Sequence, residues 1–249
     1  MVGSKRRPAN EIAADLRAGI ETGSYPPGAK LPSRSELARQ YGVAQLTVSH
    51  ALAQLRAEGL VISKQGSGSY VRQPAAVIRA ARSRLARAER AAGRGAFATD
   101  AHSGGWTARS DVTVRAESAS PEIAAALGIN TGADVLVRDR VMYADDTAVQ
   151  LATSYLPAAI TTPAMSEPDT GPGGLYARLE EAGHELTSFE ETVRIGFADS
   201  TEAAALGVVP GVAVFRLRRT AFAAGRPVEI NQITMLGDRY ELVYDLPAR

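Results

Sequence analysis

The second half of the chain repeats itself with an offset of 79 residues, and this repeat restricts its fold more than any other feature. Residues 124–128 read AAALG, and residues 203–207 read the same. The register continues without a gap through four further identical pairs: Gly132 and Gly211, Val135 and Val214, Arg140 and Arg219, and Val149 and Val228. Two copies of so long a unit indicate a duplication within one domain, because a solenoid needs at least three short repeats.

Each copy predicts the same order of elements: a helix, a tight turn, a strand, a second turn and a second strand. The turns between the strands fall at residues 144–146 and at residues 223–225. Because the two hairpins carry equivalent patterns, we expect them to share one antiparallel sheet. The fold class predicted for residues 106–249 is therefore α+β.

Residues 10–42 predict two helices. Ile12, Leu16 and Ile20 recur at intervals of four, which is typical of an amphipathic helix, and Asn10 is a plausible N-cap for it. The Ser-x-x-Glu pattern that begins at Ser33 predicts a capping box and the start of a second, two-turn helix.

Residues 43–72 predict a third helix followed by a hairpin. Four apolar residues mark the buried face of this helix: Val48, Ala51, Leu52 and Leu55. Gln45, Ser49 and Gln54 then face outward, and Gly59 suits the left-handed residue that follows a helix. Residues 60–63 and 69–72 read as strands joined through the glycine-rich residues 66–68. Three helices and a hairpin predict a winged helix over residues 1–75.

Residues 76–105 form an alanine-rich stretch that becomes glycine-rich, and we expect a linker that is helical at first. Six arginines recur in it every two to four residues: Arg79, Arg82, Arg84, Arg87, Arg90 and Arg94. Such spacing favours a solvated helix over direct contact with DNA.

Charge is unevenly distributed along the chain. The whole chain has a net charge of +1, but residues 1–75 carry +5, residues 76–105 carry +4 and residues 106–249 carry −8. A nucleic-acid-binding module joined to a module of another kind is expected to produce this asymmetry.

The composition argues against several other classes of protein. The chain has no cysteine, and its three histidines, His50, His102 and His184, are far apart in sequence, so no metal cofactor is predicted. No apolar run is long enough to span a membrane, and no apolar stretch follows the charged start as in a signal peptide. We expect a cytoplasmic protein without a membrane partner.

The first part of the chain resembles the DNA-binding domain of the GntR family of bacterial regulators over residues 9–73. Five motifs carry the resemblance: YPPG at residues 25–28, LPSRSELA at 31–38, YGV at 41–43, TV at 47–48 and EGL at 58–60. The second half resembles the UTRA ligand-sensing domain of the HutC subgroup, through ATSYLP at 152–157, GRPVE at 225–229 and GDRY at 237–240. The resemblance implies a winged helix-turn-helix joined to a chorismate-lyase-like sheet with helices.

DNA contacts are expected on the third helix and around it. In a domain of this type the third helix enters the major groove, so the groove candidates are Gln45, Thr47, Ser49 and His50. The resemblance implies arginine at positions 45 and 49 in many relatives, and this chain departs from it at both. Glutamine favours adenine where arginine favours guanine, so a different operator is expected. Contacts to phosphate or the minor groove are expected from Arg34, Ser35, Lys64, Gln65 and Gly66, although surface charge or turn formation would explain the same residues.

An effector pocket is expected on the sheet. Arg138 and Arg140 are two residues apart on a predicted strand, so they share a face and suit a carboxylate or phosphate. Cross-strand ion pairs are an equal alternative. The resemblance adds Ser154, Glu229 and Tyr240 as residues that line the cleft. Residues 95–100 lack the loop with which sugar-phosphate sensors of this group bind phosphate, and the glycine-rich residues 171–174 either bind an anion or only reverse the chain.

Three hypotheses for function follow. The first is a repressor that a small effector, anionic or neutral, releases from DNA. It is expected to act as a homodimer on a palindromic or repeated operator. The second is a regulator whose C-terminal domain only dimerises; residues 169–178 are similar to regulators common in actinomycetes, some of which control plasmid transfer. The third, remote hypothesis is an enzyme of the chorismate-lyase-like fold, although no paired catalytic groups are visible.

Overall fold

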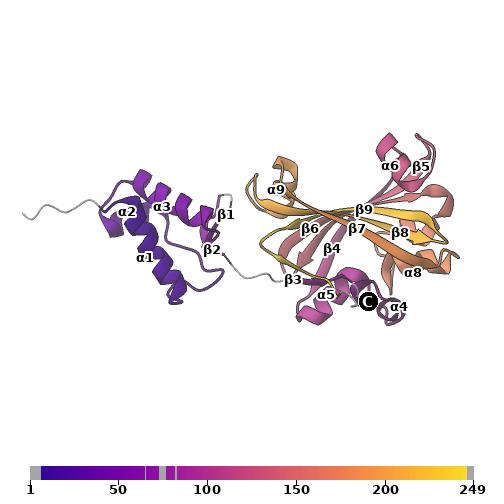
Figure 1. Ribbon diagram of the computed structural model, residues 1–249, viewed down its shortest axis with the longest axis horizontal. Coiled ribbons are helices and arrows are strands. Elements are labelled where there is room, and N and C mark those ends of the chain that lie inside the picture. Colours follow the sequence, from indigo (N-terminus) through magenta and orange to yellow (C-terminus); the bar gives the residue numbers. More distant parts are fainter. Residues whose placement is uncertain (1–6, 65, 73–76, 82, 246–249) are drawn as a thin grey trace, which may run out of the picture. The chain divides into compact units, whose positions relative to one another are not determined.

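The computed structural model describes residues 7–64, 66–72, 77–81 and 83–245, without the side chain of Lys64. The chain forms two compact units (Figure 1). One consists mainly of Met1–Pro74, and the other consists of Ala75–Leu206 and Pro210–Arg249. No helix in the described ranges is long and apolar enough to cross a membrane.

The first unit is a winged helix, as predicted. Its elements are α1 (Ala9–Glu21), α2 (Arg34–Tyr41), α3 (Gln45–Ala57), β1 (Val61–Lys64) and β2 (Gly68–Val71). The four apolar residues predicted for the inner face of α3 are buried, and they pack against Ile12 and Leu16 of α1. The capping box is also confirmed, because the amide of Glu36 donates to Ser33 Oγ (3.2 Å) and the amide of Ser33 donates to Glu36 Oε2 (2.7 Å).

The predicted N-cap of the first helix is wrong. The helix begins at Ala9, and Pro8 occupies the N-cap position without a side-chain hydrogen bond. Proline at this position stops the helix, because its fixed φ angle and missing amide limit the preceding chain to extended conformations. Asn10 therefore lies within the first turn.

The second unit is built on one antiparallel sheet of six strands in the order β4-β5-β6-β9-β8-β7. The strands are β4 (Ala108–Ser118), β5 (Asp134–Ala144), β6 (Thr147–Pro157), β7 (Leu186–Phe197), β8 (Ala213–Ala223) and β9 (Arg226–Leu236). The connections contain α6 (Pro121–Leu127), η2 (Ala158–Ile160), α7 (Pro163–Ser166), α8 (Gly174–Glu181) and α9 (Ser200–Leu206). The α+β class is therefore confirmed.

The internal repeat is also confirmed. The bounds of α6, β5 and β6 recur 79 residues later as those of α9, β8 and β9. The strand order is consequently symmetric about its centre, where β6 of the first copy pairs with β9 of the second. Helices α6 and α9 cover the same face of the sheet (Figure 1). Both hairpin turns contain a non-glycine residue with positive φ, Asp145 at 51° and Ala224 at 48°.

The linker expected at residues 76–105 is wrong. The described part of this stretch folds as part of the second unit, in β3 (Val77–Ala80), η1 (Ser83–Leu85), α4 (Arg87–Ala91) and α5 (Ala96–Gly104). Strand β3 pairs in parallel with β10 (Tyr240–Val243). Helices α4 and α5 cover the sheet face opposite to α6 and α9 (Figure 1).

The arginines of this stretch are not generally solvated. Arg79, Arg84 and Arg90 are buried, and each is bonded to a carboxylate: Glu191, Asp100 and Glu180, respectively. Arg82 lies outside the described residues. Spacing alone suggested a solvated helix, but a charge can be buried when a distant segment supplies its counter-charge.

Candidate effector pocket and nucleic-acid interface

A hollow of about 350 Å³ lies over the sheet on the face that α5 and α8 cover. Its floor is made by residues of β4, β5, β6, β8 and β9, and its rim by the first residues of α5 and α8. Both copies of the repeat therefore contribute to one site. Of the predicted effector residues, Arg138, Arg140 and Glu229 line this hollow.

Arg140, Ser154 and Glu229 form a continuous hydrogen-bonded chain. Arg140 Nη2 donates to Ser154 Oγ, and the Ser154 hydroxyl donates to Glu229 Oε1 (2.6 Å). Ser154 is fully buried, so it acts beneath the floor and orients the two charged groups. Tyr176 from α8 donates its hydroxyl to Glu229 Oε2 (2.6 Å). Both carboxylate oxygens of Glu229 thus have partners within the protein.

Arg138 is engaged differently from Arg140. Its guanidinium donates to three backbone carbonyls, those of Met165 (2.5 Å), Glu167 (2.6 Å) and Pro168 (2.8 Å). Burial, together with the nearby charge of Arg140, lowers the pKa of Arg138 to about 10, so the side chain remains charged at neutral pH. Arg138 therefore anchors the loop that leads into the glycine-rich residues 171–174.

Tyr240 does not reach the floor of the hollow. It belongs to β10, is buried, and donates its hydroxyl to Gln150 Oε1 (3.1 Å). Gln150 itself lines the hollow. Tyr240 therefore orients Gln150, which lines the hollow, without lining the hollow itself.

Arg219 and Asn231 also line the hollow, and the sequence reasoning missed both. Arg219 Nε donates to Glu191 Oε1 (2.8 Å), and Arg219 Nη1 donates to the Tyr176 hydroxyl (3.4 Å). The repeat contained the signal, because Arg219 occupies the position of Arg140 in the second copy. Asn231 is the cross-strand partner of Arg219, so the same face was implied for it.

Burial and neighbouring charges both shift the pKa values of the groups around the floor. Burial by itself would raise the pKa of Glu191, but hydrogen bonds and charges from Arg79 and Arg219 outweigh it and set that pKa at about 2. Burial raises the pKa of the Tyr176 phenol, and the charge of Glu229 raises it further, so Tyr176 is neutral. Burial lowers the pKa of Arg140, which the charge of Glu229 partly offsets.

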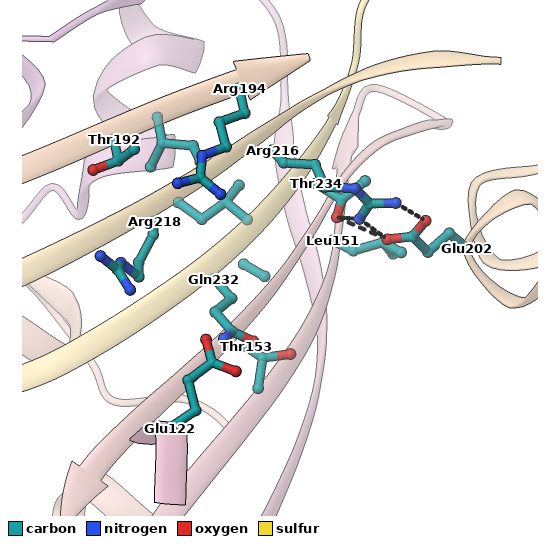
Figure 2. Close-up of a pocket in the computed structure, with 13 residues that line it drawn as sticks. Glu122, Leu151, Thr153, Thr192, Arg194, Glu202, Arg216, Arg218, Gln232 and Thr234 are labelled. Carbon is teal, nitrogen blue, oxygen red and sulfur yellow. Dashed lines mark hydrogen bonds and ion pairs between the residues drawn. The ribbon is translucent and has the colours of Figure 1, made fainter. Parts of the chain in front are cut away.

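A second hollow, of about 480 Å³, lies on the opposite face of the sheet (Figure 2). In Figure 2, Arg216 is joined to Glu202 of α9, whereas Arg194 and Arg218 stand apart from the carboxylates drawn. Arg194 and Arg218 are exposed. Water screens charges at an exposed site. This hollow therefore attracts an anion less strongly than the buried floor on the other face does.

The predicted groove residues lie in the first turns of α3, which begins at Gln45. Gln45 and His50 are exposed, while Thr47 and Ser49 are half-buried. Gln45 Nε2 donates to Ser35 Oγ of α2 (3.2 Å), which orients the amide. Leu46, which sequence reasoning did not select, is 66% exposed and offers an apolar contact beside these polar groups.

The predicted phosphate-contacting residues lie on α2 and at the hairpin. Arg34 is the exposed first residue of α2, and Lys64 ends β1. Gly66 adopts a φ of 68°, a conformation that favours glycine. Gln65 lies outside the described residues. Among the residues that are described, no group of three or more histidine and acidic side chains could hold a metal ion.

Comparisons with known proteins give the same two-part division. Residues 8–71 match the bacterial regulatory proteins of the gntR family, and residues 105–241 match the UTRA domain. The uncharacterized HTH-type transcriptional regulator SCO4628 of Streptomyces coelicolor is 32% identical, over 94% of this chain and 91% of its own. The histidine utilization repressor of Pseudomonas putida is 30% identical, over 90% of this chain and 85% of its own. The crystal structure of PhnF from Mycobacterium smegmatis superposes with a TM-score of 0.62 at 26% identity, covering 96% of this chain and 100% of PhnF.

Proposed function

Because the chain belongs to the GntR family of bacterial regulatory proteins and carries a UTRA domain, we propose that a small anionic effector releases it from its operator. The chain is a DNA-binding transcriptional repressor of the kind that its relatives represent. One observation supports the effector response most strongly. Arginines from both copies of the repeat line one hollow that is large enough for a metabolite.

The DNA-binding part of the proposal rests on α3. Gln45 reads a base edge, whereas Arg34 holds phosphate, so Gln45→Ala and Arg34→Ala differ in kind. We expect Gln45→Ala to cost about 1–3 kcal/mol on the cognate operator and to relax the preference at one position of each half-site. Arg34→Ala should weaken binding to all DNA sequences by the same factor. Equal loss on cognate and scrambled DNA in the Gln45 variant, measured by fluorescence anisotropy, would show that α3 is misassigned.

We also propose a homodimer on a two-fold operator, since one recognition helix and one wing cover only a short site. Sedimentation at micromolar concentration should give a dimer, and footprinting should protect two half-sites. Binding should fall by orders of magnitude between about 50 and 200 mM salt, because several phosphate contacts release counterions. A monomer that protects a single half-site contradicts this assembly.

The effector response is tested with Arg140. Arg140→Ala removes a charged donor from the floor of the hollow, so the variant should stay on the operator at effector concentrations that release the wild type. We expect an affinity loss of about 1.5–3 kcal/mol for the effector and unchanged operator binding. Gln232→Leu, on the opposite face of the same sheet, is the matched control.

The competing hypothesis is a C-terminal domain that only dimerises. Its hollow would then bind no metabolite, and a thermal-shift screen of the full chain would give no hit that also alters operator binding. If a compound releases the Arg140→Ala variant as readily as the wild type, the loop at residues 169–174 is the next candidate. Turnover of a bound compound would revive the enzyme hypothesis.

A further inference from the structure

Strand β7 forms one open edge of the sheet. It is the last strand in the order β4-β5-β6-β9-β8-β7, and no other described strand pairs with its outer side. Two large apolar side chains near its end face water, since Ile195 and Phe197 are each 68% exposed. An open edge offers its backbone groups to another chain, and exposed apolar groups favour such a contact. This edge therefore requires an explanation.

The other edge strand, β4, is the counterpart of β7 in the repeat and carries a similar motif. Residues 111–115 read DVTVR, and residues 190–194 read EETVR. On β4 both charges at the ends of the motif form ion pairs within the chain. On β7, Glu190 and Arg194 are exposed and have no ion-pair partner among the described residues. The charges of β7 are therefore available to a partner.

The two edges also differ in their apolar side chains. Ile195 and Phe197 of β7 correspond to Ala116 and Ser118 of β4. Among the described residues, no large apolar side chain of β4 is exposed. Because the centre of a stable interface is enriched in apolar and aromatic groups, β7 is the edge better suited to a lasting contact.

The backbone of β7 is oriented for such a contact. Just beyond the strand, the amide of Ala198 donates to the carbonyl of Val212 (2.9 Å), so Ala198 points towards the chain that leads into β8. The register with β8 has no shift beyond Ser188, and successive residues of an antiparallel strand direct their backbone groups to opposite sides. The amides and carbonyls of Glu191 and Val193 consequently point to the open edge.

A second copy that pairs antiparallel, about a two-fold axis through Thr192, makes the charges complementary. Thr192 and Arg194 lie on one face of β7 (Figure 2), and strand alternation places Glu190 on the same face. In this register Glu190 of each copy lies opposite the partner's Arg194, and Thr192 lies opposite its own counterpart. These are the non-hydrogen-bonded pairs, in which side chains approach most closely. Exposed ion pairs add little stability, so the charges specify the register rather than the affinity.

The other face of β7 supplies the apolar contact. In the same register Ile195 lies opposite the partner's Phe189, whose ring packs against Tyr176 with the ring centroids 5.2 Å apart. Phe197 lies diagonally across from that ring, a separation that an aromatic side chain can bridge. Pairing of two copies therefore removes the exposed apolar side chains of both from water.

We infer that β7 is the surface on which two copies of the chain pair, about a two-fold axis through Thr192, so that their sheets become continuous. This inference rests on the proposed homodimer and specifies its interface. Pairing of β4 with β7 would also oppose acid and arginine, but it is heterologous and leaves an open edge on each copy, so it does not close. Pairing of β4 with β4 would use charges that are already bonded within the chain.

Disulfide cross-linking tests the position of the axis on the full chain. The chain has no cysteine, so one introduced thiol in each copy can pair only with its counterpart. Thr192→Cys places that thiol on the axis, where the Cα atoms of the two copies lie about 4.5 Å apart, within the range that a disulfide spans. We expect a covalent dimer on a non-reducing gel after mild oxidation. Thr113→Cys, at the equivalent position of β4, is the matched control and should give none.

A second pair of variants tests the apolar contact. Ile195→Ala combined with Phe197→Ser gives β7 the residues of β4, and it should raise the dimer dissociation constant at least about tenfold in sedimentation equilibrium. Ser118→Ala on β4 should leave that constant unchanged. Both sites are exposed, and thermal unfolding checks that the variants are folded.

Charge reversal tests the register. Glu190→Arg and Arg194→Glu each bring like charges together across the axis, so each should weaken the dimer by a factor of a few. The combined reversal restores opposite charges and should return the dissociation constant to within about twofold of the wild type. Equal weakening that adds in the double variant would show that the two residues do not meet.

The outcomes separate this inference from the proposed homodimer. If Thr113→Cys cross-links and Thr192→Cys does not, the interface is β4 and the inference is overturned. Cross-linking only in a mixture of the two variants shows heterologous pairing and overturns it as well. If neither variant cross-links although the wild type sediments as a dimer, the homodimer stands and β7 is not its interface. A wild type that is monomeric at all concentrations contradicts the homodimer itself.

Discussion

The two copies of the repeat share a framework but differ at the residues that make the hollow. Both place an arginine at the same point, Arg140 in one and Arg219 in the other. The neighbouring positions have diverged: Arg138 corresponds to Leu217, Gln150 to Glu229, and Val112 to Glu191. The strands need only alternating buried residues, so the framework tolerates these differences. The comparison teaches that the pocket arises from the asymmetry between two otherwise equivalent halves.

The largest effect is expected at Glu191 of the second copy, a carboxylate whose side chain is only 11% exposed. Glu191→Val copies Val112 of the first copy and leaves Arg79 and Arg219 without their shared counter-charge. Breaking a buried ion pair on one side costs about 3–5 kcal/mol. The free energy of unfolding, measured with urea, should fall by that amount. Glu190→Val, at an exposed position of the same strand, is the control and should change it by less than about 0.5 kcal/mol.

The free energy of unfolding should depend on the protonation of Glu191 at acid pH. The pKa of Glu191 is about 2, below its model-compound value of 4.5, so the folded state binds the proton less tightly than the unfolded state. The stability that this group contributes is fully present above about pH 4.5 and is lost as the pH falls towards 2, a change of about 3 kcal/mol. Between these pH values the wild type should lose more stability than Glu191→Gln. Parallel pH profiles for the two proteins would contradict the assignment.

Helices α6 and α9 occupy equivalent places in the two copies, but one is held to the sheet by apolar contacts and the other by an ion pair. Ile123 on α6 is buried among apolar residues, and its counterpart Glu202 on α9 binds Arg216 and Thr234. Ile123→Ala should cost about 2–3 kcal/mol through a cavity. Glu202→Ala should cost only about 1–2 kcal/mol, because the Arg216 side chain is partly exposed. High salt should reduce the loss of stability caused by Glu202→Ala but not the loss caused by Ile123→Ala, as measured by urea unfolding.

The smallest effect is expected at the hairpin turns. Ala224 and its counterpart Asp145 both have positive φ, but Asp145 also accepts a hydrogen bond from the amide of Thr107 (3.0 Å). Ala224→Gly relieves the strained backbone and should raise stability by about 0.5–1 kcal/mol. Asp145→Gly should not, since it removes that bond. A lower midpoint for Ala224→Gly in thermal unfolding would show that the turn is not strained.

Local pattern was enough to predict the elements and part of the site. The apolar spacing of α3 and the capping box at Ser33 depend only on residues close in sequence. The repeat was found by direct comparison of the two copies, and it relates α6, β5 and β6 to α9, β8 and β9. Strand alternation placed Arg138 and Arg140 on one face without knowledge of the rest of the fold, whereas Glu229 was implied only by the resemblance to the UTRA domain.

The sequence by itself therefore determined the winged helix, the repeated unit of one helix and two strands, and the face that Arg138 and Arg140 share. Only the tertiary structure decided which charges are buried and what they bind. Arg79 meets a carboxylate 112 residues away, and Arg90 meets one 90 residues away. Arg138 donates its hydrogen bonds to loop carbonyls. Strand β3 pairs with β10, which lies near the end of the chain. These outcomes depend on distant segments, because a buried ion is stable only where another part of the fold supplies its counter-charge or its hydrogen bonds.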